Sequence, residues 1–357
     1  MEREPLNKLV NICLEKHLNF VVFSYPNSNQ FEIIIEHHLL CNHTQSHFVF
    51  HPFQVSLKHP EIKISADYRI SEGLIDADFI TEIAGLKSNT DSIDLDHLIT
   101  ISKGDYIAEL TNGIDHLKTE NLDKFIYSRI KTITKSKDLD LTNYLFRLNK
   151  KHQSAFVYLL NHQNSGTWMG ATPETLLNWT GDQISTMSLA GTLPNNGTDP
   201  VWSKKEKEEQ AYVTNYISET FSKSDISCEI GETKTVEAGP VFHLKTKLKS
   251  THSISFTDAL NFAKNLHPTP AICGVPLEAA KAMIRDIENH DRAYYTGYLG
   301  FVNPEKELKL FVNLRCLQVL PNQLALYLGG GITAKSKAEK EWDETNFKAE
   351  TLLSELE

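Results

Sequence analysis

Two pairs of glutamates share a spacing that suits a metal site. Glu206 and Glu209 stand three residues apart, as do Glu341 and Glu344, and each pair falls near the start of an expected helix. Residues at positions i and i+3 share one helical face, so each pair can direct two carboxylates at one point. Such oxygen donors suit Mg²⁺, which binds through one or two carboxylates, water and a substrate anion. Glutamate is also frequent in first helical turns, where it complements the helix dipole, so spacing alone leaves both interpretations open.

A second group of residues suits acid–base chemistry or anion binding. Lys124 begins an expected strand and Glu174 follows a Thr-Pro turn, and either could exchange a proton if burial or a charged neighbour shifts its pKa. Three glycines at 329–331 lie between an expected strand and helix, where a ligand could approach backbone N–H groups. A flexible turn is the more frequent reason for such a triplet. His243 and His267 complete the candidates.

The elements that must position these residues belong to an α+β protein. A helix is expected at 7–17. Alternating β-branched and aromatic residues predict strands at 19–25, 31–40, 48–57, 124–133, 155–160, 167–179, 184–189, 295–302, 308–319 and 323–328. Short turn-forming connections join the last three, which predicts an antiparallel meander.

Capping signals indicate where three later helices begin. The first is expected after Asp199 as N-cap, with Pro200 as the first helical residue. The second begins near Pro276. The third opens at Ser336, where Glu339 completes a capping box, and runs to the C-terminus. No long polar linker separates these elements, so the chain is expected to fold as a single domain.

Composition limits the possible functions. A chain of 357 residues with 40% hydrophobic content can bury a core without disulfides or structural metals. The formal charge of -10 repels phosphate backbones, so no nucleic-acid partner is expected. Five dispersed cysteines without a CxxC pair fit neither a disulfide framework nor a zinc ribbon. The start of the chain has no signal-like apolar segment and no run approaches a membrane span, so a cytoplasmic protein without membrane contact is expected.

Several of these segments, in order, resemble the chorismate-utilising enzymes, the family of isochorismate, salicylate, anthranilate and aminodeoxychorismate synthases. The matching stretches are 123–129, 170–177, 189–192, 203–213, 242–244, 266–271, 291–301, 314–316 and 329–348. Agreement of so many separated motifs by chance is very improbable. The resemblance implies a single α+β domain of two large antiparallel β-sheets packed together and flanked by helices. Residues 111–357 would be the chorismate-binding catalytic core and residues 1–110 a divergent part of the same fold.

The resemblance also implies roles for individual residues. Glu209 and Glu344 correspond to direct ligands of a Mg²⁺ that holds the ring carboxylate of chorismate, supported by Glu206 and Glu341 through water or indirect contacts. The residues implied to bind the substrate are Gly191, Thr192, His243, Arg315, Gly329, Gly331 and Lys348. Among them, Arg315 suits a bidentate grip on a carboxylate. His267 would also line the site, in a supporting role.

The reactions of this family differ in the nucleophile that attacks C2 of chorismate. Lys124 matches the lysine that activates water in isochorismate and salicylate synthases, and Ala190 stands where aminodeoxychorismate synthases carry a lysine. The helix after Glu209 lacks the Asp-Leu-x-Arg-Asn-Asp-like run typical of anthranilate synthases. The implied reaction is therefore that of an isochorismate synthase, in which Lys124 activates water and Glu174 protonates the departing C4 hydroxyl.

Two alternatives stay open beside this hypothesis. A salicylate synthase would make isochorismate and then eliminate pyruvate. A chorismate-binding subunit without catalysis is the non-enzymatic alternative, although it would need neither the base nor the acid. The sequence does not separate menaquinone from siderophore synthesis as the destination of the product, and a monomer is expected.

Overall fold

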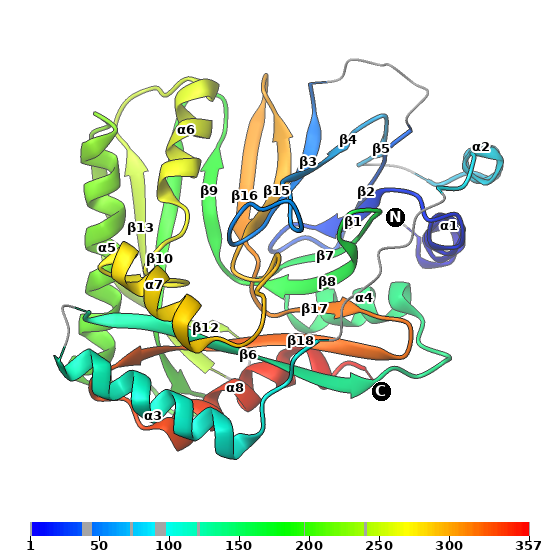
Figure 1. Cartoon of the computed structure of the whole chain (residues 1–357). Helices are drawn as coiled ribbons and strands as arrows, with labels where there is room; N and C mark the ends of the chain where they lie inside the picture. The colour runs from blue at the N-terminus through cyan, green and yellow to red at the C-terminus, as the bar shows by residue number, and fades with distance from the viewer. Residues whose placement is uncertain are drawn as a thin grey trace.

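Two antiparallel sheets of nine strands each form the framework of the protein (Figure 1). The computed structural model describes residues 2–37, 45–71, 74–89, 98–119, 122–195, 197–238 and 241–356. In spatial order, the first sheet contains β14 (Gly274–Val275), β6 (Lys124–Thr134), β18 (Gln323–Thr333), β17 (Cys316–Val319), β8 (Gly166–Thr172), β7 (Phe156–His162), β1 (Phe20–Ser24), β2 (Glu32–Ile35) and β5 (Tyr68–Ile70). The second contains β11 (Cys228–Ile230), β13 (Val241–Ser250), β10 (Ile184–Pro194), β9 (Thr175–Trp179), β16 (Glu307–Val312), β15 (Tyr298–Asn303), β3 (His47–His51) and β4 (Ile62–Ser65), with β12 (Lys234–Ala238) paired to β13.

Aromatic side chains fill the space between the two sheets. Phe48 and Phe50 point inward from β3 and meet Phe156 and Tyr158 of β7, with ring centroids 6.4 and 6.3 Å apart. Alternate residues of a strand share one face, so each strand presents every second ring to this core. The two sheets therefore share one core, as expected for a single domain.

The N-terminal part of the chain contributes to both sheets. Strands β1, β2 and β5 belong to the first sheet, and β3 and β4 to the second. The expected boundary between residues 110 and 111 falls inside helix α3 (Lys103–Thr119). The described strands of the first 110 residues thus belong to the same two sheets as the strands of the rest of the chain.

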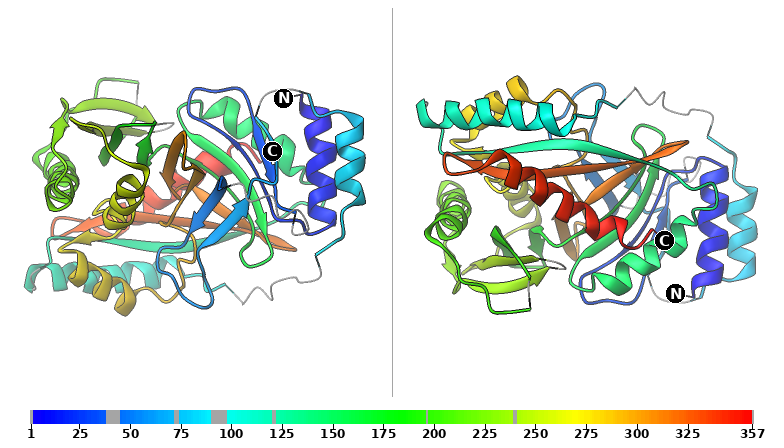
Figure 2. Two further views of the ribbon diagram at one scale, coloured as in Figure 1. Left: turned by 90° about the horizontal axis from the view of Figure 1, so that it is seen from above. Right: turned by 90° about the horizontal axis from the view of Figure 1, so that it is seen from below.

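Helices cover the outer faces of both sheets (Figure 2). The helices α1, α2 and α4 pack on the first sheet, α5 and α6 on the second, and α3 and α7 beside β6. None of the helices among the described residues is long and apolar enough to cross a membrane. Their bounds are α1 (Arg3–Glu15), α2 (Ala77–Gly85), α3 (Lys103–Thr119), α4 (Leu141–Lys151), α5 (Lys204–Lys223), α6 (Phe256–Leu266), α7 (Leu277–Ile287) and α8 (Ala338–Leu353).

Two expected strands are each broken where the chain passes from one sheet to the other. The stretch 167–179 forms β8 in the first sheet and β9 in the second, and 308–319 forms β16 in the second sheet and β17 in the first. The two crossings lie side by side, because Val312 N donates to Glu174 O at 2.9 Å and Ala171 N donates to Arg315 O at 3.1 Å.

The expected three-strand meander is therefore wrong. These residues form two hairpins, β15–β16 and β17–β18, and the two hairpins lie in different sheets. Hydrophobic alternation continues across the crossing and does not show that the partner strand changes. The physical break is local, since Arg315 adopts a left-handed backbone with φ 47° and Pro173 interrupts the other strand.

Two helices begin later than the capping signals predicted. Helix α5 starts at Lys204, and its N-cap is Ser203, which forms a capping box with Glu206. This reciprocal pair satisfies two backbone donors, which a cap at Asp199 could not do. Helix α8 starts at Ala338 without a side-chain cap, because its N-cap residue is Lys337. The Ser336 hydroxyl instead accepts from Thr333 N in the preceding turn.

Candidate active site

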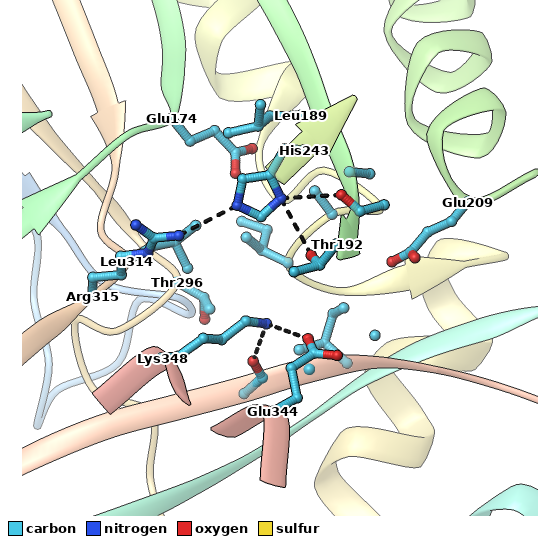
Figure 3. Close-up of a pocket in the computed structure, with 18 of the residues that line it drawn as sticks. Glu174, Leu189, Thr192, Glu209, His243, Thr296, Leu314, Arg315, Glu344 and Lys348 are labelled. Carbon is cyan, nitrogen blue, oxygen red and sulfur yellow. Dashed lines mark hydrogen bonds and ion pairs between the residues drawn. The ribbon is translucent and has the colours of Figure 1, made fainter. Parts of the chain in front are cut away.

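A pocket forms where strands of both sheets meet helices α5 and α8 (Figure 3). Among the residues expected in the site, all but Glu341 and His267 line it. Those that line it are Lys124, Glu174, Gly191, Thr192, Glu206, Glu209, His243, Arg315, Gly329, Gly331, Glu344 and Lys348. Segments far apart in the sequence thus come together around one space.

Glu174 lies at the crossing between β8 and β9 and lines the pocket. Its side chain is buried, 4% exposed, and receives no hydrogen bond from the described residues. Burial raises the pKa of Glu174 to about 8, and the charge of Lys124 offsets this only in part. At neutral pH the group is therefore a protonated acid that faces the pocket.

Lys124 and Glu209 form an ion pair on another wall of the pocket. Lys124 is 1% exposed, and its Nζ donates to Glu209 Oε1 at 2.8 Å. Burial alone would raise the pKa of Glu209, but the charge and hydrogen bond of Lys124, with the charges of Lys205 and Lys348, lower it. Glu209 is thus an ionised carboxylate at neutral pH.

Helix α8 brings two more carboxylates to the same region. Glu344 Oε1 pairs with Lys348 Nζ at 2.8 Å, and Lys348 also donates to Gly329 O at 2.8 Å. Glu341 lies one turn earlier and is buried, with Lys205 Nζ 3.7 Å from its Oε1. Burial and the nearby charge of Glu344 raise the pKa of Glu341 to about 7. A cation bound beside these two carboxylates would favour the ionised form of Glu341.

Glycines of β18 make room for these carboxylates. A Cβ on Gly331 would lie 2.6 Å from Glu209 Oε1, and a Cβ on Gly330 would lie 3.4 Å from Glu341 Oε2 and 3.7 Å from Glu344 Oε1. The donor set consists of carboxylate oxygens from two helices over a bare strand, which fits Mg²⁺. In the part of the chain that the structure describes, no three acidic, histidine or cysteine side chains already converge to hold a metal, so water and substrate would complete the coordination.

His243 orients Arg315 toward the pocket. Its Nε2 lies 3.3 Å from Arg315 Nη2, and its Nδ1 lies 3.1 Å from Gly191 O and 3.2 Å from Thr192 Oγ1. A guanidinium can only donate, so Nε2 accepts and Nδ1 carries the proton that it donates to Gly191 O. Burial and the charge of Arg315 lower the pKa of His243 to about 3. The imidazole is therefore neutral and of one tautomer.

Gly191 occupies an irregular point of β10, where the register with β13 shifts between Ala190 and Thr192. Its φ of 68° is left-handed, and a Cβ there would lie 3.1 Å from Glu206 O. The carboxylate of Glu206 accepts hydrogen bonds from the backbone N–H and hydroxyl of Ser203 as part of the capping box. Glu206 therefore lines the pocket while it caps α5, and a role beside a metal stays a prediction.

Comparison with known proteins identifies the family. The model of the chorismate binding enzyme family matches residues 30–357. The chain belongs to the chorismate binding enzymes. The match begins far ahead of residue 111, so most of the N-terminal part, in which the sequence shows no motif, lies inside the family region.

Individual relatives in the family include isochorismate synthases. The chain is 28% identical over 266 residues to isochorismate synthase DhbC of Bacillus subtilis, covering 70% of this chain and 67% of that protein. It is 29% identical over 246 residues to isochorismate synthase EntC of Escherichia coli, covering 66% of this chain and 63%, less than two thirds, of that protein. The crystal structure of DhbC from Bacillus anthracis superposes with a TM-score of 0.77 at 24% identity, over 98% of this chain and 99% of that one, which shows a shared fold.

His267 does not line the pocket of this chorismate binding enzyme. Its Nε2 donates to Phe53 O at 3.2 Å, and its ring packs edge-on against His51 and Tyr298 at 5.4 and 5.2 Å. Burial lowers the pKa of His267 to about 3, so it is a neutral core histidine. Its place in a shared motif gave no indication of which way the ring points.

Other lining residues were not singled out from the sequence. Lys205 lies in the first turn of α5, where a lysine usually indicates only a solvated helical face. Tyr295 and Thr296 lie in the matching stretch 291–301, Ala271 ends the matching stretch 266–271, and Ile272 follows it. The motifs located these segments correctly, but the choice of lining side chains depends on turns that the sequence pattern does not specify.

Proposed function

We propose that this protein is an isochorismate synthase that converts chorismate to isochorismate with the help of Mg²⁺. The observation that carries the proposal is the presence, in one pocket, of a buried protonated acid, Glu174, and a buried amine, Lys124. The names of the sequence relatives in Bacillus subtilis and Escherichia coli point the same way. Opposed acid and base groups suit a displacement in which one oxygen enters while another leaves.

The two carboxylates of chorismate would be held by separate groups. Arg315, oriented by His243, offers a planar fork that suits one carboxylate. Glu209 and Glu344 would hold the Mg²⁺, with Glu206 and Glu341 in support. When bound, the ion supplies positive charge for the ring carboxylate and fixes its position. Lys348 would contribute a further positive charge from α8.

The residues of this chain then move two protons. With Glu209 turned to the ion instead of to Lys124, the lysine would act in its neutral form and take a proton from water as the water oxygen forms a bond to C2 of the ring. The ring double bonds shift, the C4–O bond breaks, and Glu174 gives its proton to the departing hydroxyl, which leaves as water. One water enters and one leaves, so atoms and charge balance once the proton on Lys124 returns to Glu174 through solvent. Burial of Glu174 supports this role, because it keeps the proton on the acid until the hydroxyl leaves.

Product analysis tests the proposal. Purified protein is incubated with chorismate in water enriched in oxygen-18, either with Mg²⁺ or with a chelator. The products are then separated, and their masses are measured by mass spectrometry. We expect isochorismate that carries one labelled oxygen, formed only with Mg²⁺. Salicylate together with pyruvate would instead show a salicylate synthase. Binding of chorismate without turnover would show a non-catalytic binder, and unlabelled isochorismate would exclude water as the nucleophile.

A further inference from the structure

A buried ion pair lies behind one wall of the pocket. Arg292 Nε donates to Glu288 Oε2 at 2.7 Å, and Arg292 Nη2 donates to Glu288 Oε1 at 2.6 Å. Both side chains are 3% exposed. A bidentate contact of this kind fixes the orientation of both groups. Neither residue lines the pocket itself, and both line a separate hollow on the outer side.

The guanidinium of Arg292 ties together three segments that form the pocket wall. Its Nη2 donates to Ile126 O and its Nη1 to Ile272 O, each at 2.9 Å, and Nη1 lies 3.4 Å from Thr296 Oγ1. Ile126 is on β6, Ile272 precedes β14, and Thr296 precedes β15. All three line the pocket. One side chain thus sets the spacing of three parts of the wall.

Glu288 fixes β6 at a second point. Its Oε1 accepts from both the backbone N–H and the hydroxyl of Ser128 at 2.8 Å. Lys124, Ile126 and Ser128 occupy alternate positions on β6, so their side chains point to the same face. The ion pair therefore holds the second and fourth residues after Lys124.

A purely stabilising role does not explain this arrangement well. Buried ion pairs contribute little net stability, because the desolvation of two charges offsets their attraction. A protein in which apolar residues of similar volume replace such a pair is often equally stable. An apolar pair, however, could not form hydrogen bonds with the carbonyl groups of two separate segments and with a serine of β6. The planar fork of arginine donates in several fixed directions at once, which suits a residue that sets distances.

We propose that Glu288 and Arg292 are positioning residues that set where the amine of Lys124 lies relative to the bound substrate. The inference rests on the proposed role of Lys124 as the base. The groups proposed to anchor the substrate, namely Arg315 and the carboxylates of α5 and α8, make no contact with this ion pair. Loosening it should therefore slow the chemical step and leave substrate binding largely intact.

Kinetics of Arg292→Lys test the proposal. Lysine keeps the charge but loses the fork, so we expect kcat to fall about 10- to 100-fold, since small misplacements of a catalytic group have effects of that size. We expect KM to stay within about threefold, because the anchoring contacts persist. Hydrogen exchange at the amides of 124–128 should accelerate. An unchanged kcat, or a KM that rises as much as kcat falls, would overturn the proposal.

Two further variants separate positioning from general loss of stability. Ser128→Ala removes the hydroxyl contacts to Glu288 and His290 but keeps the backbone bond to Glu288. It should therefore fold and lower kcat severalfold at constant KM. An unchanged kcat contradicts the proposal even if Arg292→Lys is insoluble. Tyr144→Phe is the matched control, because the Tyr144 hydroxyl donates to Leu352 O at 2.9 Å in a buried region away from the pocket. It should lower Tm without changing kcat.

A wild-type enzyme that forms no isochorismate would refute the proposed function, whereas an active wild type with unaffected variants would refute only the positioning role.

Discussion

Glu209 and Glu174 are the same amino acid in the same pocket, yet their surroundings favour opposite protonation states. Glu209 faces Lys124 at 2.8 Å, and neighbouring lysines keep its pKa below the ordinary value. Glu174 is buried without a hydrogen-bond partner among the described residues, and its pKa rises to about 8. The difference shows that the neighbours of each carboxyl group, and not its type, decide whether it can hold a cation or give up a proton.

The two surroundings arise from different local structures. Glu209 is in the second turn of α5, where a helix can direct a whole face of carboxylates and lysines at one place. Glu174 lies where the chain leaves one sheet for the other. Its backbone carbonyl accepts a hydrogen bond there, but its buried side chain receives none from the described residues. Substitutions that exchange or remove these surroundings should therefore affect proton transfer and metal binding separately.

Removing Lys124 should have the largest effect, because it removes both the proposed base and the counter-ion of Glu209. We expect Lys124→Ala to lower the rate of isochorismate formation about 1000-fold, within the usual range for loss of an acid–base group. Lys131→Ala is the control, since Lys131 is on the same strand but outside the pocket. Circular dichroism should show both variants folded. A near-normal rate for Lys124→Ala would mean that another group activates the water.

Glu174→Gln should separate activity from stability. We expect turnover to fall about 100-fold or more, because the amide cannot give a proton to the leaving hydroxyl. The wild-type group titrates at about 8 in the folded state against 4.5 as the ordinary value, so folding binds a proton and stability falls as pH rises between these values. The glutamine variant escapes this penalty, which is on the order of a few kcal/mol.

Thermal melting at two pH values checks the stability part of that prediction. At pH 8 the Tm of Glu174→Gln should exceed that of the wild type, and near pH 4.5 the difference should largely vanish. A lower Tm at pH 8 would mean that the carboxylate is ionised and paired in the folded protein. The contrast with Glu209 would then be lost.

Metal binding should depend on Glu209 and much less on an exposed glutamate of the same helix. We expect Glu209→Gln to weaken Mn²⁺ binding by about 10- to 100-fold, the range seen when groups around a metal are altered. Glu219→Gln is the control, because that side chain is 66% exposed near the other end of α5. Titration followed by electron paramagnetic resonance measures the affinity without turnover. Equal affinities for the two variants would place the metal elsewhere.

The pH dependence of kcat/KM should report the acid. Activity requires protonated Glu174, so it should be present below about pH 8 and fall as pH rises through that value, by about tenfold per unit. Initial rates between pH 6 and pH 10 in buffers of constant ionic strength test this. A flat profile across that range would contradict a titrating carboxylic acid at this position.

Much of the fold and the candidate site could be predicted because local patterns determine it. Strands follow from alternation, and the matching motifs located residues such as Lys124 and Arg315 that meet in the pocket. The sheet-to-sheet crossings could not be predicted. In 308–319 the alternation of apolar residues continues through the crossing, and in 167–179 the Thr-Pro turn marks a break without showing that the next strand joins another sheet. Whether two consecutive strands share a sheet depends on contacts with distant strands.

The charged and buried surroundings of the site residues could not be predicted from the sequence either. The burial of Glu174 results from the crossing itself, and the pairing of Lys205 with Glu341 joins two helices that are far apart in the chain. Helix α4 was not predicted, although its N-cap Asp140 is a capping residue that the sequence shows. Helix α3, which buries Tyr106, Leu110, Ile114 and Leu117 from one face, was also not predicted, and it spans the expected domain boundary.

The smallest effect is expected from Ser203, and it tests what holds Glu209 in place. Ser203→Ala removes the cap of α5 and should cost about 1 kcal/mol of unfolding free energy, measured by denaturant titration. Mn²⁺ affinity should change by no more than about twofold, as for other interactions at a helix end, because Glu209 is fixed by Lys124. If affinity instead fell as far as in Glu209→Gln, the capping box, and with it Glu206, would be what positions the carboxylate, and the ion pair with Lys124 would be incidental.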